Sequence, residues 1–434
     1  MSFLSLATIF ALGTAVGADL PAATPVKVLS FADASRFALG LNPDLIALRY
    51  QEEAQRYRSR QALAPNNPVF AVSKNDMPGL SVTSEGASTV YTLSFTLGFP
   101  GKAISASSAN RHQAEAIREQ SAAKEIDLLV ALSNNYVALA ANQKLGNFLN
   151  EEFRKAQQLV KVLEKKYAAA QAAQADLLNA KVVVANLSHD LLDNQNDYQL
   201  QLTQFRNLIK KPGSTEYVPL VPEQIVIPRL KKSLDELSKL MLRNRHQLKS
   251  GQSQLEATQS NLTAAMLSPL PDLQLTGGLN IYHVATAGPV PGVERDYSLG
   301  IGIAVPIFFP FNELSGIQAA TRDRDAAEAQ AESQRLSAVA DLQTAYTSFQ
   351  SAQKSIDNFL GLVLPAAKAS YELTLTTYSL GKADYFILNE ARKTWTQAQK
   401  DMLAKQVATA QLFNQIVQQV GCDSNSEGGP DGCH

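Results

Sequence analysis

The 434-residue sequence predicts a mainly α-helical fold with a small β part, and three observations support this prediction. Two strand-like runs alternate apolar side chains with small or polar ones and carry no charge. Each run leads through a proline into an Ala- and Gln-rich stretch that is far longer than an ordinary globular helix. This order of elements occurs once before and once after a Pro-rich joint near residues 212–228. We therefore expect one elongated body built from two similar halves.

An internal repeat relates these halves. The helix start Ser30-x-x-Asp33, in which a hydroxyl and a carboxylate satisfy free N–H groups of the first turn, returns 203 positions later as Ser233-x-x-Glu236. Further leucine, proline and tyrosine pairs follow at offsets that grow to 211. A single match would carry little weight, but ordered matches over about 190 residues indicate a duplication.

Six segments follow from this repeat. They are a signal peptide (1–18), an N-terminal lead (19–29), a first structural repeat (30–213), a Pro-rich linker (214–232), a second structural repeat (233–420) and a Gly/Ser/Asp tail (421–434). The signal peptide is predicted from an apolar run ending in Val16-Gly17-Ala18, although no Lys or Arg precedes that run. The alternative for the run is a buried N-terminal helix.

Charge and cysteine content limit the function classes. Lys and Arg total 39 against 40 Asp and Glu, so the net charge of -1 gives no reason to expect a nucleic-acid partner. Cys422 and Cys433 bracket a short polar tail and favour a terminal disulfide loop in an exported protein. The alternative is a metal site, but with His434 they offer three ligands where structural zinc usually takes four. We expect no metal site, no cofactor and no catalytic residues.

The first repeat predicts a helix, a hairpin and two long helices. The expected elements are a helix at 30–63, strands at 69–77 and 89–99, a helix at 102–170, and a helix that ends near residue 211. Leu129, Leu132, Tyr136 and Leu139 recur at alternating spacings of three and four residues, which is typical of a coiled-coil seam. Helices of this length rarely stand alone, so we expect them to pack side by side.

The second repeat predicts the same order. The expected elements are a helix at 233–267, strands at 272–284 and 296–307, a helix at 313–380, and a final helix at 384–420. Pro365 is expected to bend or interrupt the long helix, because proline lacks the N–H group that the helix needs.

The strands are candidates for membrane-spanning segments, since they are near the 9–11 residues that cross a bilayer when tilted. Their apolar positions are Tyr91, Leu93, Phe95, Leu97 and Phe99 in the first repeat and Tyr297, Leu299, Ile301, Ile303 and Val305 in the second. An open sheet edge in hydrocarbon would leave backbone groups unpaired, and four strands cannot close a barrel. Three copies would supply twelve strands, and the long helices would form a coiled-coil barrel continuous with them.

A set of short motifs follows the duplication in order. They are Asn42-Pro43-Asp44-Leu45, the strand starts at Pro68 and Pro271, Phe99-Pro100-Gly101-Lys102, Val305-Pro306-Ile307-Phe308, and the tyrosine-containing turns before Asp176-Leu177-Leu178 and Asp384-Tyr385. Over about 30–420 this set resembles the TolC-type outer-membrane efflux protein family. The residues at 66–68 and 100–102 look most like its cation-efflux branch. The sequence departs from the family in lacking the lipidation cysteine that is common in relatives, and in its Cys-bearing tail.

This resemblance implies a homotrimer in the outer-membrane lipid, with a helical tunnel that reaches into the periplasm. It also implies a periplasmic adaptor and an inner-membrane pump of the resistance-nodulation-division or ABC type as partners, and drugs or metal cations as substrates. The protein itself would do no chemistry. The alternatives are the outer-membrane duct of a type I protein secretion system, a passive porin, or a periplasmic coiled-coil scaffold.

The helix-to-helix turns near 168–176 and 380–384 are expected at the periplasmic tip, because they are the breaks midway along the long helical stretches. Gly381 can take a left-handed conformation there. Asp176 and Asp384 are expected to cap the helices that follow, or to form carboxylate rings under threefold symmetry. The flanking residues Tyr167, Tyr378 and Lys382 are expected to take part in locking a closed state.

Lys102 lies in the strand-to-helix corner at residues 98–103, which lacks the spacing and the Ser/Thr of a phosphate-binding loop. We expect it to be a solvated residue at the membrane rim. The tyrosines Tyr91, Tyr282 and Tyr297 are expected near strand ends, in an aromatic girdle.

Overall fold

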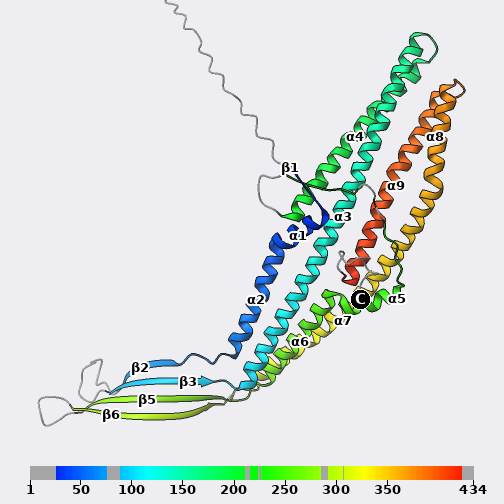
Figure 1. Ribbon diagram of the computed structural model, residues 1–434. Coiled ribbons are helices and arrows are strands. Elements are labelled where there is room, and N and C mark those ends of the chain that lie inside the picture. The colour runs from blue at the N-terminus through cyan, green and yellow to red at the C-terminus, as the bar shows by residue number, and fades with distance from the viewer. Residues whose placement is uncertain are drawn as a thin grey trace, which may run out of the picture.

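The computed structural model describes residues 26–75, 88–210, 216–222, 225, 227–284, 292–305 and 307–422. The molecule is elongated, with a four-stranded sheet at one end and the turns of two helical hairpins at the other (Figure 1). The elements in chain order are β1 (Val26–Leu29), α1 (Phe31–Leu41), α2 (Pro43–Leu63), β2 (Val69–Asn75), β3 (Ser88–Leu97), α3 (Pro100–Ala168), α4 (Gln174–Ile209), β4 (Glu216–Pro219), α5 (Leu234–Asn244), α6 (His246–Met266), β5 (Asp272–Val284), β6 (Gly292–Ala304), α7 (Glu313–Asn358), the π-helical turn η1 (Phe359–Val363), α8 (Leu364–Ser379) and α9 (Tyr385–Val420).

The first helix of each repeat is broken, where the sequence predicted one continuous helix. Asn42 ends α1 and caps α2, and its side chain accepts a hydrogen bond from the Asp44 amide at 2.8 Å. Pro43 explains the break, because a proline disfavours helical geometry in the residue before it and fits the first turn of a new helix. Arg245 takes the same place between α5 and α6 without a proline.

The long helices match their predicted extents closely. The helix α3 has 69 residues, and the predicted seam residues Leu129, Leu132, Tyr136 and Leu139 are all buried on it. The predicted interruption at Pro365 takes the form of η1, a π-helical turn that separates α7 from α8. A proline two residues into α8 cannot donate to the turn before it, which accounts for the locally wider helix.

The helical body has two levels along its length, one nearer the sheet and one nearer the hairpin turns, and four helices lie side by side at each level. Nearer the sheet, α2 packs on α3, α3 on α6, and α6 on α7. Nearer the hairpin turns, α4 packs on α3, α3 on α9, and α9 on α8. The outermost helices are therefore α2 and α7 at one level and α4 and α8 at the other, and each of these keeps one side without a neighbour among the described elements (Figure 1).

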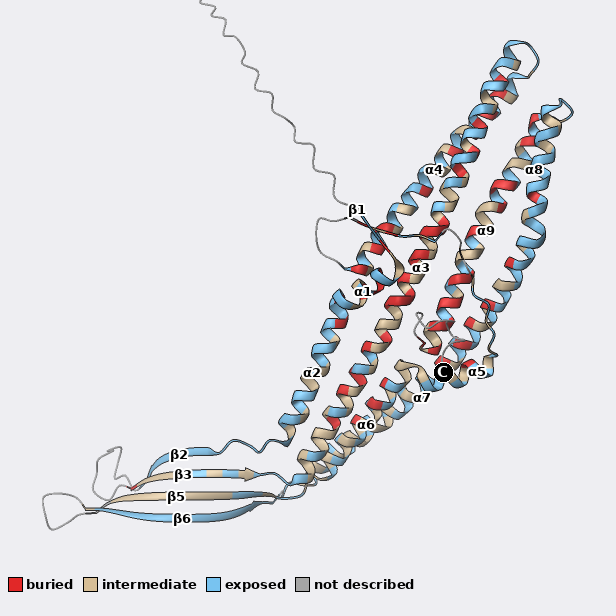
Figure 2. Cartoon of the chain, in the orientation of Figure 1, coloured by how far each residue is buried: buried red, intermediate tan, exposed pale blue. Residues whose placement is uncertain are grey.

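The main core lies where the two levels meet. Phe349 of α7 and Phe413 of α9 have ring centroids 5.8 Å apart, and Leu237 and Met241 of α5 are fully buried beside them. Gly421, directly after α9, adopts φ +76° against the α5–α6 junction. Buried residues line the inside of this helical body, whereas β2 and β6 are exposed along nearly their whole length (Figure 2).

A second, small sheet joins the N-terminal lead to the linker between the repeats. The strands β1 and β4 pair in parallel, with Val26 opposite Glu216 and Leu29 opposite Pro219. The Tyr136 hydroxyl donates to the Leu29 carbonyl at 3.1 Å, so α3 anchors this sheet. Neither segment was predicted from the sequence to form secondary structure.

Candidate functional site

The larger sheet has the strand order β2-β3-β5-β6 and is antiparallel throughout. Its register places most of the large apolar residues of the four strands on one face. Two rows of partners run across that face: one is Phe70, Leu93, Gly277 and Leu299, and the other is Val72, Tyr91, Leu279 and Tyr297. Since residues alternate between faces with a period of two, Phe95, Leu97, Ile301 and Ile303 fall on the same side, whereas Val69 and Val90 fall on the opposite one.

No element of the described residues covers this apolar face. Leu299 is 96 % exposed and Ile301 is 78 % exposed, far more than apolar side chains of a water-soluble sheet would be. The opposite face carries Thr92 and Ser298 as the two partners of Gly278, with Thr276 one level along between Ser94 and Gly300. On the apolar face, charge is confined to Lys74 and Arg295, which lie on one level near the end of the sheet away from the helices. A sheet with one mainly apolar face and one small, polar face suits an environment that is lipid on one side and aqueous on the other.

Two of the predicted strand residues lie outside the strands. Phe99 is the residue before α3, and its amide donates to Asp272 Oδ1 at 3.1 Å instead of to a neighbouring strand. Val305 follows the last residue of β6, and its carbonyl accepts from the Ile307 amide at 3.0 Å. Each precedes a proline that has no N–H for a strand ladder, so both strands end earlier than predicted.

Of the three tyrosines predicted near strand ends, Tyr282 lies two residues from the end of β5, whereas Tyr91 is the fourth residue of β3 and Tyr297 the sixth of β6, so the aromatic girdle stays a prediction. Tyr91 and Tyr297 lie at the same level of the apolar face, on either side of Leu279. Tyr282 lies an odd number of residues from Leu279, so its side chain points to the opposite face.

Lys102 was predicted to be a solvated residue, but its side chain is half-buried and makes specific contacts. Its ammonium donates to Asp272 Oδ1 at 2.9 Å and to the Leu270 carbonyl at 2.7 Å. The first strand-to-helix corner is thereby tied to the start of β5 in the second repeat. This ion pair could not be predicted from the sequence, because its two residues are 170 positions apart.

At the other end of the molecule, both hairpin turns share one geometry. Gly381 has φ +73°, its amide bonds to the Tyr378 carbonyl, and the Lys382 amide bonds to the Thr377 carbonyl at 2.9 Å. These two bonds form a Schellman cap, which requires a left-handed residue. The same pair of bonds closes α3, where Ala170 takes the left-handed position with φ 55°.

A cluster of aromatic and cationic side chains joins the two hairpins just above these turns. The Lys166 ammonium lies 5.3 Å from the Tyr378 ring centroid, and Tyr378 meets Tyr385 edge-on at 6.2 Å. Tyr385, from the start of α9, is buried against Leu163 and Leu177. Burial, with the nearby Asp176 charge, raises the pKa of the Tyr378 hydroxyl above its ordinary value.

The predicted tip residues are only partly brought together. Tyr378 belongs to this cluster, whereas Tyr167 and Lys382 are exposed beside it. The residues Lys166 and Tyr385 were missed by the sequence analysis. The repeat offered no signal for Tyr385, because its counterpart at an offset of 211 is Gln174.

The two aspartates differ from each other in position. Asp176 is the third residue of α4, after the N-cap Ala173, so the predicted N-cap role is wrong for it. Asp384 does occupy the N-cap of α9, but its side chain makes no capping hydrogen bond. Asp384 is exposed and Asp176 is half-buried.

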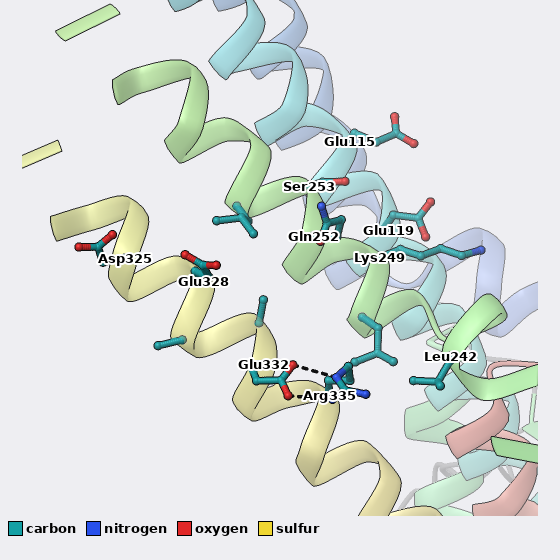
Figure 3. Close-up of a pocket in the computed structure, with 14 residues that line it drawn as sticks. Glu115, Glu119, Leu242, Lys249, Gln252, Ser253, Asp325, Glu328, Glu332 and Arg335 are labelled. Carbon is teal, nitrogen blue, oxygen red and sulfur yellow. Dashed lines mark hydrogen bonds and ion pairs between the residues drawn. The ribbon is translucent and has the colours of Figure 1, made fainter. Parts of the chain in front are cut away.

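A groove of about 1070 Å³ runs along the helical wall between α6 and α7, beside α3 (Figure 3). Its charged lining consists of Glu115, Glu119, Lys249, Asp325, Glu328, Glu332 and Arg335. Most of these carboxylates have a basic neighbour: Glu332 accepts from Arg335 at 2.8 Å and Glu119 lies 2.7 Å from His246. The wall here therefore combines paired charges with apolar residues such as Leu248 and Leu255.

Three further predictions concern membrane-spanning helices, metal binding and the two cysteines. Within the described ranges, no helix is long and apolar enough to cross a membrane. In that same part of the chain, no group of three or more His, Cys, Asp or Glu side chains could hold a metal ion. Cys422 is buried next to α9, and Cys433 lies outside the described residues, so their predicted pairing stays a prediction.

Comparison with known proteins places this geometry in a family. The model of the outer membrane efflux protein family matches residues 35–209 and 237–421. No curated protein matches the chain by sequence. Among solved structures, the chain is similar to CusC, with 18 % identity, a TM-score of 0.76, and coverage of 91 % of this chain and 92 % of that one.

Two further structures are similar to the same degree. The outer membrane protein VceC from Vibrio cholerae shares 18 % identity at a TM-score of 0.75, with coverage of 90 % of this chain and 96 % of VceC. The open state of the Neisseria gonorrhoeae MtrE outer membrane channel shares 18 % identity at 0.70, with coverage of 90 % and 89 %.

The chain belongs to the outer membrane efflux protein family, the TolC-type family that its motifs resemble. It is a non-enzymatic outer membrane channel protein, with its helical part on the periplasmic side. Channels of this family form trimers in tripartite efflux systems.

Proposed function

We propose that three copies of this chain form the outer-membrane duct of a tripartite efflux system. The proposal rests on one observation. At every level of each copy, the two outermost described elements have no neighbour on their outer side. The free edges are β2 and β6 in the sheet, α2 and α7 in the helical body near it, and α4 and α8 near the turns. Joining these edges between copies would close a twelve-strand barrel and a helical tunnel in one step.

Side chains on these edges support this assembly. Tyr50 and Tyr57 of α2 are 67 % and 65 % exposed and lie seven residues apart on the side away from α3. Leu373 of α8 and Leu380, the residue directly after α8, are exposed at the same spacing. A spacing of seven residues is that of a coiled-coil seam, so these apolar rows suit a helix of the next copy.

In this trimer, the tip cluster of Lys166, Tyr378 and Tyr385 would hold the two hairpins of each copy together and narrow the entrance. The three copies of Asp384 would add an exposed carboxylate each to that entrance, and Asp176 would lie beside it. A periplasmic adaptor and an inner-membrane pump would engage this end, and the pump would select the substrates, which we propose to be drugs or metal cations.

The assembly can be tested on the full-length protein expressed in a Gram-negative host. We expect the protein to fractionate with the outer membrane and to have three times the chain mass by native mass spectrometry in detergent. A protein that stays monomeric and dissolves without detergent would contradict the proposal. Partners can then be identified by cross-linking in cells that carry candidate adaptors, with drug and metal-ion susceptibility as the readout for substrates.

A further inference from the structure

A second cavity lies between the two helical hairpins, a short way from the turns, and has a volume of about 250 Å³. It is lined by both hairpins: Leu159 comes from α3 and Val183 from α4, whereas Leu375 comes from α8 and Leu388 from α9. Its walls are mostly apolar and its size is that of a small organic molecule. A molecule bound here would touch both hairpins at once.

Two cations border this cavity, and they differ in how they are neutralised. Lys155 lies 2.8 Å from Glu151 and 3.0 Å from Glu152, so its charge is balanced within α3. Arg392 of α9 donates to the Asn389 amide oxygen at 3.0 Å, and no carboxylate of the described residues pairs with it at ion-pair distance. Burial lowers the pKa of this guanidinium, and the charges of Glu152 and Asp190, which lie beyond ion-pair distance, act in the opposite direction without cancelling the effect of burial.

A carboxylate is the group that best complements an arginine in this setting. The guanidinium presents paired N–H donors that match both carboxylate oxygens, and such charged hydrogen bonds are strongest where water is excluded. The apolar walls favour a ligand with a hydrocarbon or aromatic body. Asn389 and Gln158 supply further polar contacts at the cavity wall.

We infer that this cavity binds a small amphiphilic carboxylate, with its anion on Arg392 and its apolar body on Leu159, Leu375 and Leu388. The bound molecule bridges the α3–α4 and α8–α9 hairpins and stabilises their packing in the present arrangement. This site is separate from the duct and does not depend on the trimer proposal, because one copy supplies its whole lining.

The chain carries its own reporter for this site. Trp395 is the only tryptophan in the sequence, and it packs with Tyr371 and Leu388, which both line the cavity. Its ring meets Phe148 of α3 edge-on at 5.9 Å, so its emission depends on how the hairpins are packed. Binding in the cavity should therefore change the tryptophan fluorescence, which comes from Trp395 alone.

The test is a titration of the full-length protein, reconstituted in lipid nanodiscs, with 3-phenylpropionate and with its neutral amide. We expect a saturable change in Trp395 emission with the acid, at least about tenfold weaker binding of the amide, and a rise in the unfolding temperature with the acid alone. Arg392→Gln should weaken binding of the acid about tenfold or more, whereas Arg154→Gln, an exposed arginine of α3, should leave it unchanged.

Arg392 is largely buried, so a variant at the rim provides a second test that does not touch the core. Val162 lines the cavity and is 46 % exposed. Val162→Glu should repel the acid, and Val162→Gln should not. The inference is overturned if the acid gives no saturable signal, if the amide binds equally well, or if Val162→Glu binds the acid as the unmodified protein does.

Discussion

At the scale of single residues, the positions that tolerate substitution least are those where an added side chain would contact neighbouring backbone atoms too closely. Gly421 is the clearest case. A Cβ atom at this position would lie 2.8 Å from the Arg245 Cα and 3.1 Å from the Asn244 carbonyl carbon, and the backbone φ of +76° is one that other residues rarely adopt.

We therefore expect Gly421→Ala to destabilise the junction of α9 with α5 and α6 by about 2 kcal/mol or more, from backbone strain together with the close approach. Thermal unfolding of the purified protein measures this effect. Gly316→Ala is the matched control, because that helical glycine has no atom within 4 Å of an added Cβ, and the change should be neutral or stabilising. Equal stability of the two variants would contradict the argument.

The hydroxyl of Tyr371 makes the stability of the fold depend on pH. Burial and the nearby Glu152 charge raise the pKa of its hydroxyl from 10.0 to about 12. The unfolded chain thus loses this proton first as pH rises, so the stability that Tyr371 contributes is complete below pH 10 and is lost by about pH 12. We expect Tyr371→Phe to flatten the fall in unfolding temperature over this range. An unchanged slope would show that other groups cause the alkaline loss.

At the scale of elements, the sequence predicted most helices and strands, because long periodic patterns and prolines mark them clearly. It missed β1 and β4, which are four residues each and pair across about 190 positions. It also missed contacts such as Lys102 with Asp272 and Lys166 with Tyr378, since no local pattern reports which distant side chains will meet. The tip turns were located correctly, but which residues of them cluster depends on how the hairpins pack.

The two hairpin turns offer a direct comparison of elements. Both need a left-handed residue in the same position, and glycine takes this conformation about 1 kcal/mol more readily than alanine. Ala170→Gly should therefore slow hydrogen exchange at the α3–α4 turn, and Gly381→Ala should speed exchange at the α8–α9 turn. Hydrogen exchange with mass spectrometry resolves both turns in one experiment. Opposite or equal effects would show that the caps do not limit local opening.

Asp384 is suited to a test of conduction that spares helix stability. Its side chain makes no capping bond, so Asp384→Ala should leave the unfolding temperature nearly unchanged. If its three copies surround the entrance of a trimer, this change should reduce cation preference in planar-bilayer recordings. Ser379→Ala, a neutral change near the same turn, is the control. Currents identical to those of the unmodified channel would remove Asp384 from the entrance.

At the scale of the whole molecule, the uncovered apolar face of the sheet decides where the protein can reside. Leu299 lies near the middle of that face, and Ser298 lies next to it on the opposite one. In a membrane, Leu299→Arg should cost about 2–4 kcal/mol of folding free energy, whereas Ser298→Arg should be tolerated. Urea-dependent folding into liposomes measures both. Equal costs would mean that the two faces do not meet different solvents.

The small parallel sheet of β1 and β4 has a consequence for the order in which the chain folds. Its two strands are about 190 residues apart, and closing so large a loop is slow unless the intervening helices have already brought the ends near. The residues after position 219 would then take their places against helices of the first repeat that have already folded. Scrambling residues 26–29 should accordingly release residues 216–219 as well as the N-terminal lead, while α6 and α9 stay packed on α3.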